Sequence, residues 1–287
     1  MAGALPTMEA PCADRGASPT SSRRFVAGLV QNVSEPANRS QPASPPPARL
    51  PVGTPLSRLP EFDPRRVPSL GPDMHLPPIG PQRLTPEAML HRFHAPPVWT
   101  PEVVAEKRFS DRAAMQAAVL VPLVMRGPAR DVLTVLLTER ALHMNTHSGQ
   151  VAFPGGKVDP SDADLAATAL REAHEEVGLE ARFVEVIGHL PLYTTGTAFS
   201  VTPVVALVRP EFQLKPNPAE VADAFEVPLA FLMNPAHHHR HVFEWTSDAG
   251  PERREWFSMT YADPHGERFI WGATAAMLRN FYRFLAA

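Results

Sequence analysis

Three glutamates near the end of an expected helix are the residues of this chain that could most directly do chemistry. Glu172, Glu175 and Glu176 stand at i, i+3 and i+4, so they share one helix face and repel one another by about 0.2–0.5 kcal/mol per pair. Carboxylates at the C-terminal end of a helix cost roughly 0.3–1 kcal/mol each, because that end carries partial negative charge. A divalent cation removes the conflict, since hard cations are bound by clustered carboxylate oxygens. The spacing therefore predicts a metal site.

A Gly-Gly turn and a capped helix are expected to position these carboxylates. Gly155 and Gly156 carry no Cβ, so their backbone amides can approach a phosphate or a metal ion. Ser161 or Asp162 is the expected N-cap of the helix, and Gly178 is its expected C-terminal stop. The apolar stripe beside the glutamates consists of Ala166, Ala169, Leu170, Ala173 and Val177. The glutamates are therefore expected to face a cleft rather than the core.

The rest of the chain mixes helix and strand patterns. Two Thr-Pro-Glu sequences predict short helices, from Thr85 to about Phe93 and from Thr100 to about Phe109, because Thr caps a helix and Pro is tolerated in its first turn. Apolar runs predict strands over 117–125, 132–138, 151–153, 183–190, 201–208, 220–225, 242–245 and 256–261, a helical turn over 229–233 and a closing helix over 274–285. This mixture predicts an α/β or α+β domain with mixed strand directions.

Composition divides the 287 residues into three parts. Most of the 34 prolines precede Pro101, and residues 1–78 show no clear apolar period, so they are expected to form a disordered leader rich in Pro, Ser, Ala and Arg. Residues 79–112 are expected to be a short helical segment, and residues 113–287 a domain large enough for one core. A start at Met74 or Met89 would remove the leader, and this alternative stays open.

Charge, cysteine and apolar content narrow the class of protein. A formal net charge of −3 disfavours a general nucleic-acid or membrane-surface binder. The single Cys12 allows no internal disulfide, and no apolar run approaches the roughly 20 residues that span a bilayer. The lone cysteine fits a reducing compartment, and we expect a cytoplasmic protein. Arg23 and Arg24, among Ser and Thr residues, leave an organelle transit peptide as an alternative.

Two motifs carry a resemblance to a known family. Gly156, Arg171-Glu172, Glu175-Glu176 and Gly178-Leu179 resemble the Nudix box, with Asp162 at its first acidic position and eight residues, rather than seven, between Asp162 and Arg171. Upstream, residues 136–141 and 149–156 are similar to the extra motif of coenzyme A pyrophosphatases in the Nudix family: Leu-Leu-Thr-x-Arg-Ala, then Gly, three residues and Phe-Pro-Gly-Gly. The second arginine of that motif is Asn145 here. The resemblance covers nearly all of residues 115–285.

The resemblance implies a fold, a reaction and a set of site residues. The fold would be the Nudix α/β/α sandwich with a mixed sheet. The reaction would be metal-dependent hydrolysis of the diphosphate in coenzyme A or an acyl derivative, giving 3′,5′-ADP and (acyl-)4′-phosphopantetheine, with Mg²⁺ or Mn²⁺. Glu172, Glu175, Glu176 and the Gly156 carbonyl would bind the metal, and Arg171 would orient the glutamates. Glu175 or Glu220 would be the general base, and Thr138, Arg140, Phe153 and Gly155 would contact the substrate.

Several alternatives remain at this point. Asn145 keeps other diphosphates, such as ADP-ribose or a dinucleotide, as alternative substrates; a non-catalytic Nudix module and a homodimer also stay open. Arg140 would otherwise be a surface residue and Phe153 a core residue. His237, His238, His239 and His241 suggest zinc, but consecutive histidines point in different directions, so an exposed polar connection is expected there. Trp271 and the closing helix are expected in the core.

Overall fold

The computed structural model describes residues 62–107, 113–143, 149–248 and 250–287. Its first helix, α1 (Pro86–His94), begins as expected, because the Thr85 side chain accepts a hydrogen bond from the Ala88 amide at 3.2 Å. The other α-helices are α2 (Leu165–Val177), α3 (Leu229–Leu232) and α4 (Gly272–Ala286), and the 3₁₀ turns are η2 (Pro81–Arg83), η3 (Ala181–Phe183) and η4 (Pro235–His237).

A mixed sheet of eight strands forms the centre of the fold. Its main path runs β4–β3–β2–β8–β6, with β5 and β7 paired to β2 and β8, and β9 paired to β3. The strands β2 and β8 are parallel, and the other pairs are antiparallel. The bounds are β2 Met115–Arg126, β3 Val132–Arg140, β4 Val151–Ala152, β5 Gly155–Lys157, β6 Val184–His189, β7 Tyr193–Thr194, β8 Phe199–Val208 and β9 Val221–Pro228.

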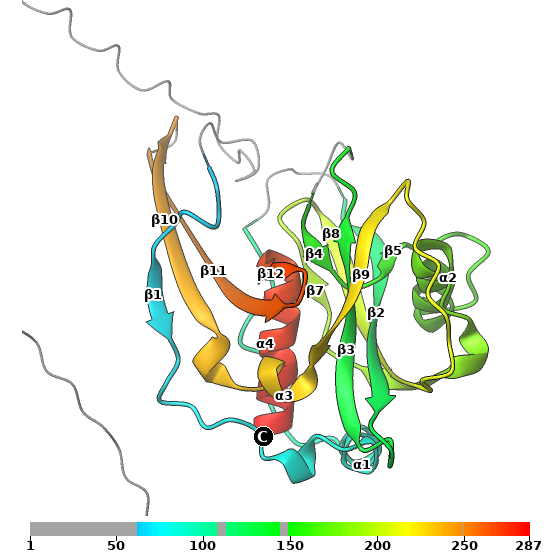
Figure 1. The fold of residues 1–287 in the computed structure, drawn as a ribbon. Coiled ribbons are helices and arrows are strands. Elements are labelled where there is room, and N and C mark those ends of the chain that lie inside the picture. The colour runs from blue at the N-terminus through cyan, green and yellow to red at the C-terminus, as the bar shows by residue number, and fades with distance from the viewer. Residues whose placement is uncertain (1–61, 108–112, 144–148, 249) are drawn as a thin grey trace, which may run out of the picture. The chain divides into compact units, whose positions relative to one another are not determined.

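Two apolar cores cover the two faces of this sheet. Ala169, Ala173 and Val177 of α2 pack with Leu120 and Leu136 of the sheet, forming the smaller core. The larger core combines the opposite face with α1 and α4 (Figure 1). The strands have buried side chains on both faces, so they read as nearly continuous apolar runs. The α/β/α sandwich with a mixed sheet is confirmed.

A second sheet adds to the sandwich and was only partly expected. It has the order β1–β10–β11–β12, with β1 Ser69–Pro72, β10 His239–Ser247, β11 Gly250–Asp263 and β12 Gly266–Trp271. The hairpin over 242–261 was predicted, but β1 and β12 were not. Because β1 pairs with β10, the leader boundary at residue 78 was wrong: residues 62–78 belong to the described fold. Residues 1–61 lie outside the described residues.

The helix predicted over Thr100–Phe109 was also wrong in its described part. Residues 101–107 instead form an extended strap in which Ala105 bridges to Thr194 of β7. The Asn280 side chain of α4 accepts hydrogen bonds from the amides of Glu102 at 2.9 Å and Val103 at 3.0 Å. Thr194 takes backbone groups that a helix would have used, because its carbonyl accepts from the Glu106 amide at 2.8 Å and its amide donates to the Val104 carbonyl at 3.1 Å. Residues 108 and 109 lie outside the described part.

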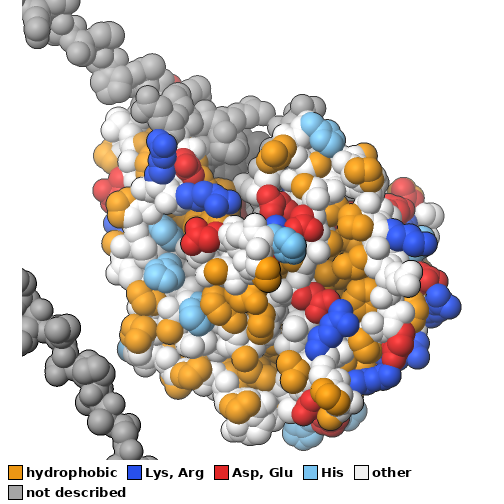
Figure 2. Space-filling model, in the orientation of Figure 1, with side chains coloured by type: hydrophobic (Ala, Val, Ile, Leu, Met, Phe, Trp, Pro, Cys, Tyr) orange, Lys and Arg blue, Asp and Glu red, His pale blue; other side chains and the backbone are white. Residues whose placement is uncertain are grey.

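Two features of the molecule concern its surface charge and the length and hydropathy of its helices. On the face drawn in Figure 2, Lys and Arg side chains lie among Asp, Glu and apolar side chains, as a net charge of −3 would suggest. Among the helices of the described residues, none is both long and apolar enough to cross a membrane.

Candidate active site

The glutamate helix α2 is held at both ends by local hydrogen bonds. Its N-cap is Asp164, whose carboxylate accepts from the Ala167 amide at 2.7 Å, so the predicted caps Ser161 and Asp162 were wrong. At the other end Gly178 has φ +71° and its amide donates to the His174 carbonyl at 2.9 Å, as predicted for a helix stop. Asp164 and Gly178 therefore fix the two ends of the helix that carries the glutamates.

Arg171 binds one acidic side chain that precedes the helix and two that lie within it. Its Nε and Nη2 donate to the two carboxylate oxygens of Asp162 at 2.9 and 3.0 Å, a bidentate pair. Its Nη1 donates to Glu172 at 3.0 Å and Glu175 at 3.1 Å, and Nη2 also donates to the Lys157 carbonyl at 3.0 Å. The hydrogen bonds from Arg171 hold the pKa of Asp162 well below its usual range. Asp162, displaced by one residue in the box, thus fixes the arginine rather than the helix cap.

The three glutamates occupy different environments. Glu176 is buried at 4% exposure, and burial raises its pKa to about 8, with the nearby charges of Glu172 and Glu220 adding to the rise. The pKa of Glu172 is also raised, mainly by burial. The side chain of Glu175 is 52% exposed and pairs with Arg171. Two carboxylates of the box are therefore desolvated, and the third faces solvent.

The two glycines before the helix sit where a side chain would collide. They belong to the strand β5, paired with Ala118 and Val119 of β2, rather than to a turn as predicted. A Cβ on Gly156 would lie 2.6 Å from the carboxylate of Glu172. A Cβ on Gly155 would lie 2.5 Å from the Ala118 carbonyl oxygen and 2.6 Å from the Val119 Cα. Gly156 thus leaves room for a carboxylate, and Gly155 for the neighbouring backbone.

This difference predicts opposite outcomes for two matched substitutions. Gly156→Ala should displace the end of the Glu172 side chain, lowering kcat about tenfold or more, as changes to outer contacts of metal sites do, with little loss of stability because no backbone is met. Gly155→Ala meets rigid backbone, so it should lower the free energy of unfolding by about 1–3 kcal/mol, the usual cost of overpacking. Urea unfolding and steady-state kinetics on both variants check this. Equal loss of stability in the two variants would contradict the assignment.

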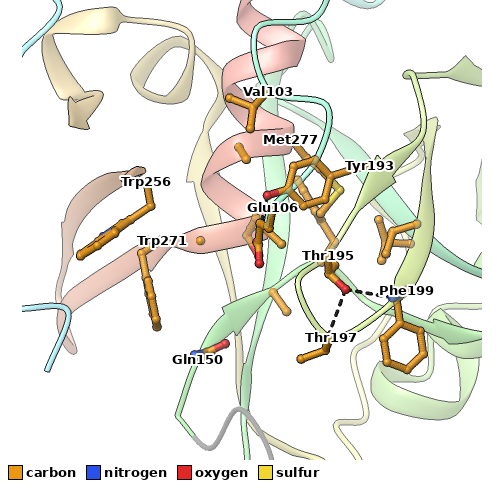
Figure 3. Close-up of a pocket in the computed structure, with 18 of the residues that line it drawn as sticks. Val103, Glu106, Gln150, Tyr193, Thr195, Thr197, Phe199, Trp256, Trp271 and Met277 are labelled. Carbon is orange, nitrogen blue, oxygen red and sulfur yellow. Dashed lines mark hydrogen bonds between the residues drawn. The ribbon is translucent and has the colours of Figure 1, made fainter. Parts of the chain in front are cut away.

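A cavity of about 1030 Å³ opens beside Glu172 and Glu176. Its wall joins the glutamate helix, β5, the strap at 102–107, β7–β8 and the second sheet. Figure 3 shows part of this wall: Trp256 and Trp271 lie at one side, Phe199 at the other, and Tyr193 and Glu106 between them. The size lies at the upper end of ordinary ligand pockets, about 300–1,000 Å³.

The structure brings most of the predicted site residues to this cavity. The predicted residues in the wall are Arg140, Phe153, Gly155, Gly156, Glu172, Glu176 and Glu220. Arg140 lies close enough to Glu176 for its charge to lower the pKa of that carboxylate, against the larger effect of burial. Phe153 is both wall and core, at 3% exposure.

Three predicted residues stand apart from the wall. Glu175 and Arg171 lie outside the cavity lining. Thr138 is 2% exposed, and its hydroxyl donates to the Ala152 carbonyl at 3.3 Å, so the structure does not bring it to the cavity. Asn145 lies outside the described residues.

The donor set suits a hard divalent cation in kind. Glu172, Glu176 and Glu220 line one cavity, and the charges of Glu172 and Glu220 raise the pKa of Glu176, which is the repulsion that a cation relieves. In the described part of the chain, however, no three Asp, Glu, His or Cys side chains converge into a complete metal site. Arg171 Nη1 donates to both Glu172 and Glu175, so the guanidinium charge lies between these two box carboxylates.

The buried glutamate predicts a distinctive pH dependence. The pKa of Glu176 is about 8 when folded and 4.5 in its ordinary state, so between these values the folded protein holds a proton that the unfolded chain has released. Stability of the metal-free protein should therefore fall as pH rises through this window, by up to a few kcal/mol from this group. Urea unfolding with a chelator at about pH 5 and pH 8 measures the slope. Glu176→Gln should flatten it, and an unchanged slope would contradict the burial argument.

The sequence did not reveal the part of the wall contributed by the strap and the second sheet. Tyr193 donates its hydroxyl proton to Glu106 at 2.9 Å, and the same carboxylate accepts from the Gly196 amide at 3.0 Å. Tyr193 and Glu106 are 87 residues apart in the sequence, so no local pattern relates them. Trp271, expected in the core, is half-buried and lines the cavity.

The histidine segment also differs from expectation. His238 and His241 are buried at 0% and 5% exposure, so the predicted exposed connection was wrong for these two. The Nε2 of His238 lies 2.7 Å from the Leu232 carbonyl oxygen, and His241 lies 2.8 Å from the Ser258 hydroxyl. Both side chains therefore serve as hydrogen-bonded core residues.

The fold and the site together define the class of protein. A mixed sheet with a Glu-rich helix on one face, preceded by a Gly-Gly strand, is the arrangement of a Nudix domain, and the family described as the NUDIX domain matches residues 114–246. A relative from Enterobacter sp. (strain 638) is 44% identical over 165 residues, covering 58% of this chain and 80% of the relative. One from Salmonella paratyphi B is 41% identical over 200 residues, covering 69% and 93%. Both bear the name "Uncharacterized Nudix hydrolase NudL".

The chain therefore belongs to the Nudix hydrolase family. Nudix hydrolases act on small nucleoside diphosphate substrates and generally use divalent metal ions such as Mg²⁺ or Mn²⁺. Among solved structures, a C. elegans Ap4A hydrolase aligns with 43% of this chain and 86% of its own, at 22% identity and a TM-score of 0.35. The NUDIX domain of Shewanella oneidensis NrtR, complexed with ADP ribose, aligns with 42% and 75%, at 24% identity and a TM-score of 0.32.

Proposed function

We propose that this chain hydrolyses the diphosphate bond of coenzyme A or an acyl-coenzyme A, giving 3′,5′-ADP and (acyl-)4′-phosphopantetheine. The observation that carries the proposal is the position of the upstream motif. The Leu-Leu-Thr-x-Arg run ends on β3 at Arg140, and the Phe-Pro-Gly-Gly run ends on β5, so Arg140, Phe153 and Gly155 line the cavity that also holds Glu176. The segment similar to the coenzyme A motif and the Nudix box thus meet at one site.

Mg²⁺ or Mn²⁺ would be held by Glu172 and Glu176, with the Gly156 carbonyl as a further ligand. When bound, such an ion neutralises phosphate oxygens and lowers the pKa of a bound water. Arg171 positions Glu172 through the hydrogen bond at 3.0 Å and is itself fixed by Asp162. Arg140 would place its charge beside the diphosphate. In this proposal Glu172 and Glu176 bind the metal ion, Arg171 orients Glu172, and Arg140 binds the diphosphate.

Proton transfer is assigned to Glu220. A water oxygen attacks one phosphorus, the anhydride P–O bond breaks, and both products leave as phosphate monoesters. The proton of the water passes to the Glu220 carboxylate and then to solvent. Glu220 lines the cavity with Glu172 and Glu176, whereas Glu175 faces solvent and pairs with Arg171, which favours Glu220 of the two candidates.

The products of one incubation test the proposal. With coenzyme A and Mg²⁺ or Mn²⁺, we expect 3′,5′-ADP and 4′-phosphopantetheine in equal amounts by chromatography, and neither in the presence of a chelator. A sample that contains no 3′,5′-ADP with either metal would refute the coenzyme A assignment. Cleavage of ADP-ribose or a dinucleotide in the same preparation would then support the alternative that Asn145 keeps open.

A non-catalytic Nudix module is the alternative of another class. Such a module has no need to keep carboxylates that repel one another in a buried place. This chain retains all three box glutamates, and two of them have pKa values raised by burial. Their retention favours a catalytic site.

A further inference from the structure

The cavity continues well past the residues that would hold a diphosphate. Lys157, which follows Gly156, lies at the glutamate end of the cavity. Its Nζ is 5.8 Å from the ring centroid of Phe199. The far end is formed by Trp256 and Trp271, whose rings are 6.2 Å apart at 67°. Figure 3 shows Phe199 and the tryptophan pair on opposite sides, with Tyr193 and Met277 between them. The wall between the two ends combines the rings and the thioether of Tyr193 and Met277 with the polar side chains of Glu106 and Thr195.

The second sheet places the two tryptophans on one face. Trp271 pairs with Ser258 across β11 and β12, and Trp256 precedes Ser258 by two residues, so both side chains point to the same side. Trp256 also stacks on His241, its cross-strand neighbour on β10, with ring centroids 5.5 Å apart and ring planes at 7°. Trp256 is 8% exposed, so this is a built wall rather than a loose surface patch.

The cations near this end are compensated by carboxylates. Each lies beside at least one acidic side chain: Lys107 with Glu252, Arg240 with Glu102 at 3.1 Å, Arg253 with Glu255 at 2.7 Å, and Arg254 beside Glu106 and Glu252. A subsite for a phosphate group would need an excess of positive charge. This balance instead favours an uncharged occupant.

We propose that the far end of this cavity, walled by Trp256, Trp271, Tyr193, Val103 and Met277, is a subsite for the uncharged arm of the substrate: a pantetheine chain carrying an apolar acyl group. The assignment rests on the proposed function, because it places that arm next to a diphosphate held at the glutamates. It adds a substrate preference, since an acyl chain would cover apolar wall that free coenzyme A leaves in contact with water. The structure thus predicts discrimination by acyl length.

Binding of a probe without a diphosphate tests the subsite separately from catalysis. Isothermal titration calorimetry of the full chain should show octanoyl-pantetheine binding at least about tenfold more tightly than pantetheine, because its chain removes apolar surface from water. Trp271→Ala should reduce this ratio several-fold, and Trp271→Phe should keep most of it. Trp99→Ala is the matched control, since Trp99 packs on Phe284 and does not line the cavity.

The outcomes separate the two proposals. Equal affinity for the two probes in the wild type, or a ratio unchanged by Trp271→Ala in a protein that keeps its melting temperature, overturns the subsite. If Trp271→Ala does not fold, the wild-type ratio together with Trp271→Phe decides. A tenfold ratio without hydrolysis of coenzyme A would leave the subsite standing and refute the proposed reaction. Hydrolysis without any acyl preference would do the reverse.

Discussion

Glu176→Gln is expected to lower kcat for diphosphate hydrolysis by about 10³-fold or more, because under the proposed function it removes a metal-binding carboxylate and forfeits several kcal/mol of transition-state stabilisation. The fold should survive, since Glu176 is 4% exposed and a neutral amide of equal size avoids the cost that raises the carboxylate pKa. At about pH 8 and without metal, the variant should be at least as stable as the wild type. Steady-state kinetics and urea unfolding on one preparation measure both effects.

Glu185→Gln is the matched control for this substitution. Glu185 is an exposed glutamate on β6, beyond the C-terminal end of the box and outside the cavity wall. It should leave kcat and stability unchanged. Turnover by the Glu176 variant within threefold of the wild type would remove Glu176 from the chemistry, whatever happens to stability.

Glu220→Gln is expected to lower kcat by about 10²–10⁴-fold, the usual contribution of general acid–base catalysis. Its amide cannot accept the proton of the attacking water, while its size keeps the cavity wall intact. Glu175→Gln separates the two candidates for the base, because Glu175 is half-exposed and bound to Arg171. We expect a much smaller loss for Glu175→Gln. The reverse order of losses in kcat would assign the base to Glu175.

The elements that the sequence predicted are those with strong local patterns. The stripe from Ala166 to Val177 and the αL stop at Gly178 need no distant partner, so α2 and its end were correct. Its start was less certain, since Ser161, Asp162 and Asp164 are all good N-caps. Arg171 takes both oxygens of Asp162, and this pairing leaves the cap to Asp164. A side-chain pair nine residues apart thus decided between N-caps that look equally good in the sequence.

The same contrast explains the failures. Thr85 and Thr100 begin similar Thr-Pro-Glu sequences, yet only the first caps a helix. After Thr100 the backbone is bound by Asn280 and Thr194, about 90 to 180 residues away in sequence. The strand β1 likewise depends on pairing with β10, and its own four residues, Ser-Leu-Gly-Pro, carry no strand pattern. The cavity wall from the second sheet was missed for this reason, although the glutamate end was found.

The relative kcat/KM for coenzyme A, ADP-ribose and a dinucleoside polyphosphate, measured on one preparation with Mg²⁺ and with Mn²⁺, tests the central claim most directly. The account predicts the highest value for coenzyme A or its acyl derivatives, with loss of activity toward every substrate in Glu176→Gln. A higher value for ADP-ribose or the dinucleotide than for coenzyme A would contradict it.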